Sequence, residues 1–403
     1  MVWWQEPSVQ LKLQLVGRFH LIVACVPLLP FILLRRLIRC LSKLPSRDCC
    51  GPKEIGRPLV PTMQGLHQRF VELYGKSSAD GNKTCGFSDG HSEAAAMGMQ
   101  QRLTLKDGQE IAYWDLGPPN AKEVVMLCQG LGARIAGWVP LLDALCSGTG
   151  ADQVAWRQRR LVIPEYRGQF ASIPLVGGPV SVEQGAKDVA DVASALGIKA
   201  ATLLCWSTGV QIGLQLTLDQ PNLVKAMILI QGFNGQMCSC MMQPVFSLPG
   251  MPSMLLYSLR VLPKYMRGHF RKALYEFTLR NTKGLERLLS FMVWFFGSDF
   301  MPTIGVRYAQ DMIQSDAHFA NYCGYAVALD KHNISARLGD IKARALVVTG
   351  TPDFVTPARC SYDIASKLGG ATTFVDDFGA SHYFILEEPH KLARMIEAFL
   401  SQQ

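Results

Sequence analysis

The sequence predicts an α/β fold in which a mostly parallel sheet is flanked by helices. From Gln101 onward, short apolar runs alternate with stretches of helical periodicity. The segment RLTLKDGQEIAYWDLG opens this pattern and predicts a hairpin, with Asp107-Gly108 as the turn between two alternating strands. A hydrophobic content of 49% and a charged fraction of 18% are typical of a globular protein with a large core.

The predicted core strands are apolar runs, and the stretches between them favour helices. Strand–helix alternation predicts parallel strands with helices on both faces of the sheet. The strands are predicted at 124–128, 160–164, 202–205, 226–230, 345–350 and 372–376, and the helices near 135–146, 181–196, 209–219 and 387–401.

Residues 236–343 interrupt this alternation with a helical, Met-rich and aromatic pattern that contains no convincing strand. They predict a helical insertion over the carboxyl edge of the sheet, where such sheets bind ligands. The α/β core is then 99–235 together with 344–403. The apolar side chains of the insertion either contact a lipid or acyl chain or fill its own core: Met241, Met242, Phe246, Met251, Met254, Leu255, Phe291, Met292, Trp294, Phe295 and Phe296.

Residues 1–44 predict a membrane anchor. The apolar run from Leu21 to Leu34 is shorter than the roughly 20 residues of a full span, and Pro27 and Pro30 interrupt helical hydrogen bonding. A kinked span, a re-entrant hairpin and an interfacial segment all fit, and a buried helix of the globular domain is the alternative. Residues 45–98 are rich in Gly, Ser, Pro and charge and predict a flexible linker.

Positive charges flank the apolar run unequally. Five cations follow it and two precede it, so the positive-inside bias predicts a membrane-associated protein whose main domain faces the cytosol. The net charge of +8 is spread too widely to indicate nucleic-acid binding. The twelve cysteines show no metal-ligand spacing and are interpreted as reduced thiols. We expect neither a metal nor a cofactor.

A candidate nucleophile stands where a predicted strand meets a predicted helix. The segment Cys205-Trp206-Ser207-Thr208-Gly209 has small residues two positions either side of Ser207. This is the pattern of a nucleophile elbow, where bulkier side chains would clash with the neighbouring backbone.

A serine hydroxyl needs a base and a group that orients that base. Asp353 follows the predicted strand 345–350, and His382 lies in a loop after 372–376. The order Ser207, Asp353, His382 is the one that this architecture requires. The backbone N–H groups of Thr208 and Leu131 are the predicted donors to an oxyanion.

The segments QGLGARIAGW, PEYRGQFAS, CWSTG, GTPDFVTP and GASHYFILEEP resemble, in order, the landmarks of the α/β-hydrolase superfamily. The resemblance covers roughly residues 101 to 401 and implies the α/β-hydrolase fold, a helical lid and a serine hydrolase of the esterase or lipase type. Three positions depart from the common family pattern: Gln129 before the glycine, Cys205 for the first elbow glycine, and Ser381 before the histidine.

Serine in the elbow disfavours the relatives that use a carboxylate nucleophile. Hydrolysis of a lipid or small-molecule ester through an acyl-enzyme is therefore the leading hypothesis. Two alternatives stay open: a non-catalytic binding or scaffold protein, and non-hydrolytic use of the same triad such as C–C bond cleavage.

Overall fold

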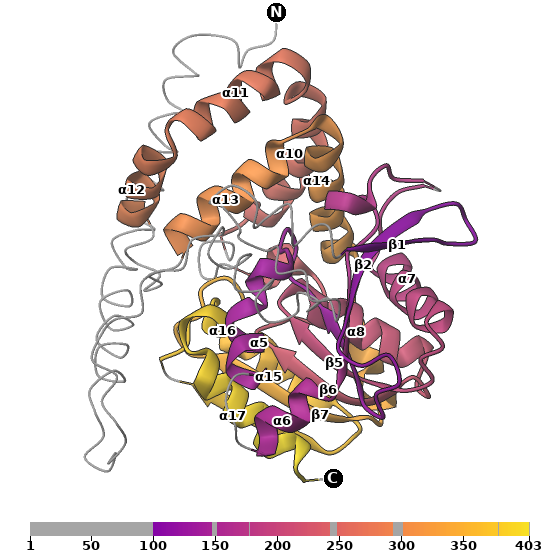
Figure 1. Cartoon of the computed structure of the whole chain (residues 1–403). Coiled ribbons are helices and arrows are strands. Elements are labelled where there is room, and N and C mark those ends of the chain that lie inside the picture. The colour runs from indigo at the N-terminus through magenta and orange to yellow at the C-terminus, as the bar shows by residue number, and fades with distance from the viewer. Residues whose placement is uncertain are drawn as a thin grey trace, which may run out of the picture.

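An eight-stranded sheet organises the computed structural model, which describes residues 100–146, 151–176, 178–241, 248–292, 301–377 and 379–402 (Figure 1). The strand order is β1-β2-β4-β3-β5-β6-β7-β8. The strands are β1 (Gln101–Thr104), β2 (Glu110–Leu116), β3 (Val124–Cys128), β4 (Arg160–Pro164), β5 (Ala201–Trp206), β6 (Val224–Ile230), β7 (Arg344–Gly350) and β8 (Thr372–Asp377).

The predicted anchor, residues 1–44, and the predicted linker, residues 45–98, lie outside the described ranges, so both stay predictions. Within those ranges, no helix combines the length and the hydropathy that crossing a bilayer requires.

The hairpin at the sheet edge forms as predicted. Strands β1 and β2 pair antiparallel, with Thr104 opposite Glu110. Gly108 takes a φ of 83° in the turn, which a residue with a side chain rarely adopts. The Leu105 N–H donates to the Gln109 carbonyl at 2.8 Å and closes the turn.

The remaining strands, from β4 to β8 in the sheet order, pair in parallel. Their apolar runs suit this arrangement because both faces are covered. Helices α5 (Val139–Cys146), α6 (Ala151–Arg157) and α17 (Pro389–Leu400) pack into one core cluster. Helices α7 (Val182–Ala195), α8 (Thr208–Asp219) and α15 (Ala358–Lys367) pack into the other. All predicted strands are confirmed.

Two predicted helices begin differently. The segment predicted as one helix at 135–146 starts with a 3₁₀ turn, η2 (Ile135–Gly137), before α5. The C-terminal helix is preceded by a short separate one, α16 (Phe384–Glu387), and α17 starts at Pro389. Proline lacks an N–H and suits the first position of a helix, which explains the break.

The described residues between β6 and β7 are mostly helical. They contain α9 (Met237–Cys240), α10 (Met251–Tyr265), α11 (Gly268–Arg280), α12 (Thr282–Met292), α13 (Met301–Ile313) and α14 (Asp316–Lys331), followed by η6 (Ser335–Asp340). Figure 1 shows α10 to α14 gathered at one end of the sheet. Tyr325 and Leu329 of α14 are fully buried and join this layer to the core.

Candidate active site

Ser207 occupies a strained corner between β5 and α8. Its φ of 56° and ψ of −118° lie where non-glycine residues are rare. A Cβ on Gly209 would lie 1.9 Å from the Cys128 carbonyl oxygen, so only glycine fits two positions after the serine. The corner therefore has the tight strand-to-helix geometry that the sequence predicts.

Cys205 fits in the elbow because α8 leaves it room. A Cβ on Gly213 would lie 2.4 Å from the Cys205 sulfur. The sulfur thus occupies the space that a side chain at 213 would need. Burial raises the pKa of the Cys205 thiol, which keeps the thiol protonated within the core.

The structure brings the three predicted catalytic side chains into one hydrogen-bonded row. His382 Nε2 lies 3.0 Å from Ser207 Oγ, and His382 Nδ1 lies 3.0 Å from Asp353 Oδ2. Each residue follows the end of a different parallel strand: β5, β7 or β8. Asp353 is fully buried and His382 is 7% exposed, so bulk water screens their interaction weakly.

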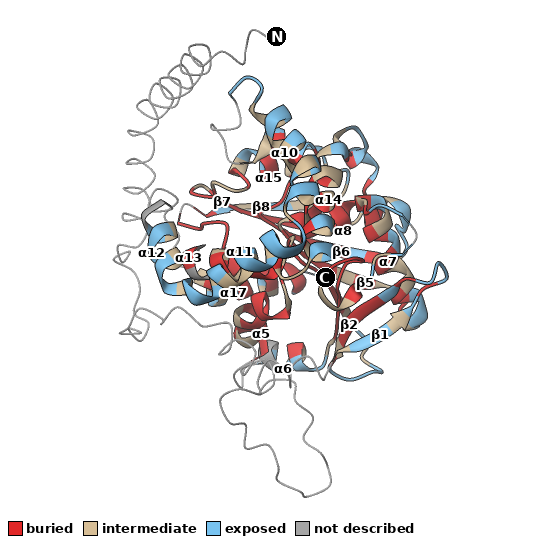
Figure 2. Cartoon of the chain, turned by 90° about the horizontal axis from the view of Figure 1, so that it is seen from above, coloured by how far each residue is buried: buried red, intermediate tan, exposed pale blue. Residues whose placement is uncertain are grey.

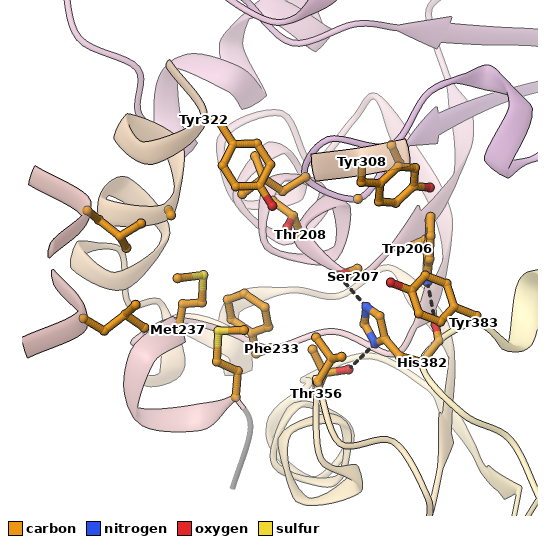
Figure 3. A pocket seen from close by; sticks show the side chains of 18 residues that line it. Trp206, Ser207, Thr208, Phe233, Met237, Tyr308, Tyr322, Thr356, His382 and Tyr383 are labelled. Atoms are coloured by element: carbon orange, nitrogen blue, oxygen red, sulfur yellow. Dashed lines mark hydrogen bonds between the residues drawn. The ribbon is translucent and has the colours of Figure 1, made fainter. Parts of the chain in front are cut away.

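A residue that the sequence analysis missed, Thr356, fixes the acid. Its N–H donates to Asp353 Oδ1 at 2.8 Å, and its hydroxyl lies 2.7 Å from Asp353 Oδ2. This hydroxyl also lies 3.1 Å from His382 Nδ1 (Figure 3). The same hydroxyl lies 2.9 Å from the Gln231 carbonyl oxygen. The signal in the sequence was a threonine three residues after an aspartate, which is a common local turn pattern.

The loop that carries His382 is held from three sides. Trp206 Nε1 donates to the His382 carbonyl at 3.2 Å, and the Gln231 amide donates to the Ser381 carbonyl. The Ser381 hydroxyl donates to Glu387 Oε2 at 2.8 Å and accepts from the Tyr383 N–H at 3.2 Å. The serine that departs from the family pattern therefore braces this loop.

Gln129 and Gly130 bring the loop after β3 against the nucleophile. The buried side-chain amide of Gln129 donates to the Pro164 carbonyl at 3.4 Å, and the Gln129 backbone carbonyl accepts from the Tyr166 hydroxyl at 2.9 Å. A Cβ on Gly130 would lie 3.4 Å from Ser207 Cβ, so the backbone passes close to the serine. The next residue, Leu131, lines the same cavity as Thr208. Their role as oxyanion donors stays a prediction.

A cavity of about 300 Å³ opens at Ser207. Helices α10, α13 and α14 contribute to its wall, with Tyr308 and Tyr322 visible in Figure 3. One part of the wall is apolar, formed by Phe233, Met237, Met241, Leu255, Leu259 and Ala326. Among the described residues that line it, none is Asp, Glu, Lys or Arg.

Three tyrosines, Tyr308, Tyr322 and Tyr383, also line this cavity. In Figure 3 the Tyr322 hydroxyl points toward Thr208 and the Tyr383 hydroxyl toward the serine and histidine. Burial raises the pKa of all three phenols, that of Tyr322 to about 12. They are neutral near pH 7 and can donate hydrogen bonds. In the described part of the chain, no three His, Cys, Asp or Glu side chains are arranged to hold a metal ion.

Known proteins resemble both the sequence and the fold. A putative carbamate hydrolase, RutD, from Caulobacter segnis is 25% identical over 299 residues, which are 72% of this chain and 95% of the relative. An esterase from Exiguobacterium antarcticum has a TM-score of 0.55 at 17% identity, and covers 75% of this chain and all of its own. A membrane phospholipase A has a TM-score of 0.54 at 17% identity, over 97% of this chain and 98% of its own.

The model of the alpha/beta hydrolase fold family matches residues 123–389, well over half of the chain. This range includes β3 to β8, the insertion, Ser207, Asp353 and His382. The protein belongs to the α/β-hydrolase fold family and is a hydrolase by that membership.

Proposed function

We propose that the protein is a serine hydrolase that cleaves a carboxylic ester through an acyl-enzyme. The observation that carries this proposal is the row Ser207, His382, Asp353, with 3.0 Å at each contact and a serine held at positive φ. A catalytic serine needs this arrangement because its hydroxyl is a weak nucleophile until a base takes its proton.

In the proposed reaction, Ser207 Oγ attacks the ester carbonyl carbon while His382 Nε2 takes the hydroxyl proton. The Thr208 and Leu131 N–H groups stabilise the negative oxygen that forms. The intermediate collapses, and His382 returns the proton to the departing alcohol. A water molecule then attacks the acyl-enzyme with His382 as its base, which releases the acid and restores Ser207. Asp353 keeps the His382 ring oriented, and Thr356 positions Asp353.

The apolar wall beside Ser207 supports an acyl chain as the group that the cavity holds. Burying each methylene contributes about 0.8 kcal/mol, so a chain lying against Met237, Met241 and Leu255 would be bound appreciably. We therefore propose a lipid or other acyl ester as the substrate and residues 236–343 as its lid. The proposed membrane anchor within residues 1–44 would keep the enzyme near such a substrate.

A carbamate is the second candidate substrate, because the relatives at 25% identity are named as putative carbamate hydrolases. The same serine and histidine could attack a carbamate carbonyl. The cavity favours the ester, since its lining offers many apolar side chains and no acidic or basic residue other than His382 among the described ones.

The test is labelling with a fluorophosphonate probe in detergent, comparing wild type with Ser207→Ala. Ser253→Ala is the matched control, because Ser253 is exposed on α10. We expect labelling of wild type and Ser253→Ala and none of Ser207→Ala. Panels of acyl esters of graded length and of carbamates then rank the substrates.

Other results would point elsewhere. A folded wild type that stays unlabelled would favour a non-catalytic binding protein. Labelling at Ser207 together with turnover of a C–C bond substrate, and none of esters or carbamates, would favour the non-hydrolytic use of the triad.

A further inference from the structure

The outer layer of the insertion, α10 to α12, is unusually exposed. Neither α10 nor α11 contains a single buried residue. Figure 2 shows α11 and α12 almost entirely in the colours of exposed and intermediate residues. A helix of a globular protein normally buries one apolar stripe, but among the residues that the structure describes nothing buries the outer side of these helices.

The exposed residues include large apolar side chains. Of the twelve large hydrophobic residues that are exposed in the described ranges, eight belong to these helices. Tyr265 is 74% exposed, Tyr257 68% and Phe270 62%. The full set is Met254, Tyr257, Leu262, Tyr265, Phe270, Phe277, Leu279 and Leu288. A concentration of this kind marks an interaction site in a soluble domain.

On α10 the exposed side chains and the cavity side chains occupy different faces. Met254, Tyr257 and Tyr265 recur at spacings that place them on one stripe of the helix. Leu255 and Leu259 share another stripe and line the cavity beside Ser207. One helix therefore separates the catalytic cavity from whatever covers the outer stripe.

The same segment carries most of the net charge of the chain. Residues 251–292 contain eight Lys and Arg and two Glu, which gives six of the eight net positive charges. Arg271 is bound to Asp316 and to two backbone carbonyls. Lys264, Arg267, Lys272, Lys283 and Arg287 are exposed.

We propose that this surface docks on an anionic lipid bilayer. The α10–α12 face is the solvent-exposed surface of these three helices, and it carries the eight exposed apolar side chains named above together with Lys264, Arg267, Lys272, Lys283 and Arg287. Aromatic residues favour the membrane interface, and basic residues beside them are attracted to anionic headgroups. The charge excludes a second copy of the same face as its partner, since two surfaces of like charge repel each other. A zwitterionic surface would leave the cations without counter-charge.

Docking would bring the active site close to a membrane substrate, and this consequence rests on the proposed ester hydrolase. With the outer stripe of α10 against lipid, Leu255 and Leu259 form the wall between the bilayer and Ser207. Only the thickness of α10 would then lie between the bilayer and the cavity.

The experiment is hydrogen exchange by mass spectrometry on the full chain in lipid nanodiscs. One set contains phosphatidylcholine alone and the other adds about 30% phosphatidylserine. We expect the amides of 253–290 to exchange about tenfold more slowly with phosphatidylserine, and the difference to shrink at high salt. The combined variant Lys264→Glu, Lys272→Glu, Lys283→Glu should lose this difference.

A matched variant reverses three exposed lysines of the α/β core: Lys122→Glu, Lys199→Glu, Lys225→Glu. It should behave as wild type. The proposal would be overturned if the wild-type amides exchanged equally in both nanodiscs. It would also be overturned if both charge variants lost the phosphatidylserine-dependent difference to the same extent. It would also fall if the wild-type face were already protected without lipid, because the chain itself or another copy would then cover it.

Hydrolysis of a short water-soluble ester separates the two proposals. Both charge variants should retain it, since neither changes a residue of the cavity. Lipid-dependent protection without any esterase activity would leave the docking face standing and remove the proposed hydrolase.

Discussion

The central strands and helices α10 to α12 use similar apolar residues in opposite environments. Leu203, Leu204 and Cys205 of β5 are 0% exposed, whereas Tyr257 and Phe270 are more than half exposed. In the sheet, close packing against neighbours on both faces limits the size and shape of each side chain. In α10 and α11 no residue is buried by the described part of the chain, so packing within the domain does not explain the large apolar residues there. The core therefore positions the catalytic groups, whereas the outer helices, as proposed above, contact the surface on which the substrate lies.

Buried and exposed carboxylates should differ most in how pH affects stability. Burial raises the pKa of Glu165, just after β4, from 4.5 to about 7. The folded state thus binds the extra proton between about pH 4.5 and 7, and stability falls as pH rises through that window. We expect Glu165→Gln to remove this slope and to be more stable than wild type by about 3 kcal/mol at pH 8. Urea unfolding of both proteins from pH 5 to 8 measures the slope and the difference in stability.

The control acid is Asp316 at the start of α14, where Arg271 lowers the pKa of the carboxyl. Its contribution to stability is present above its ordinary pKa and is lost only in more acidic solution. Asp316→Asn should therefore leave the slope between pH 5 and 8 intact. A slope that persists in Glu165→Gln would contradict the assignment of that slope to Glu165.

Packing beneath the elbow gives the second test. In Gly213→Ala the new methyl would lie 2.4 Å from the Cys205 sulfur, within a fully buried layer. We expect a loss of about 2–3 kcal/mol in the free energy of unfolding, because overpacked cores do not relax freely. Adding Cys205→Ala should restore most of it, since the methyl would be 3.7 Å from Cys205 Cβ. Additive losses in the double variant would show that the sulfur is not the obstacle.

The third test compares two buried threonines: the hydroxyl of one is hydrogen-bonded within the site, and the hydroxyl of the other is not hydrogen-bonded. Thr356→Val removes the hydrogen bond to Asp353, and we expect kcat for an ester to fall by about 10- to 100-fold. In the described structure the Thr349 hydroxyl, within β7, is buried without a hydrogen-bond partner. Thr349→Val should keep full activity and gain about 1 kcal/mol of stability. Thr356→Ser should recover activity, and equal rates in Thr356→Val and wild type would refute the positioning role.

The smallest expected change in stability comes from a substitution in the outer helices. A Cβ on Gly284, within α12, would meet nothing within 4 Å. Gly284→Ala should raise stability by about 0.5–1 kcal/mol through helix propensity alone. Thermal unfolding measures the gain. A loss comparable to that of Gly213→Ala would mean that α12 is packed as tightly as the core.

Much of the site was predictable because its signals are local in the chain. The elbow around Ser207 is five consecutive residues, and Asp353 and His382 each follow an apolar strand. Thr356 was missed because its role depends on Gln231 and His382, which are remote in sequence and reach it only in the fold. The short helix α16 before Pro389 was not predicted, because a helix of four residues is too short for a helical period to be recognised.

The sequence by itself determined the order of strands and helices, the elbow and the three polar residues of the row, because each depends on periodicity or on a short motif. Tertiary structure decided how the departures from the family pattern are accommodated. Cys205 is tolerated because Gly213 faces it, and Ser381 braces its loop because Glu387 folds back to it. It also decided that α10 divides the cavity from an exposed basic and aromatic face. Such features depend on tertiary contacts between side chains that are distant in sequence. Composition and spacing along the chain do not specify those contacts.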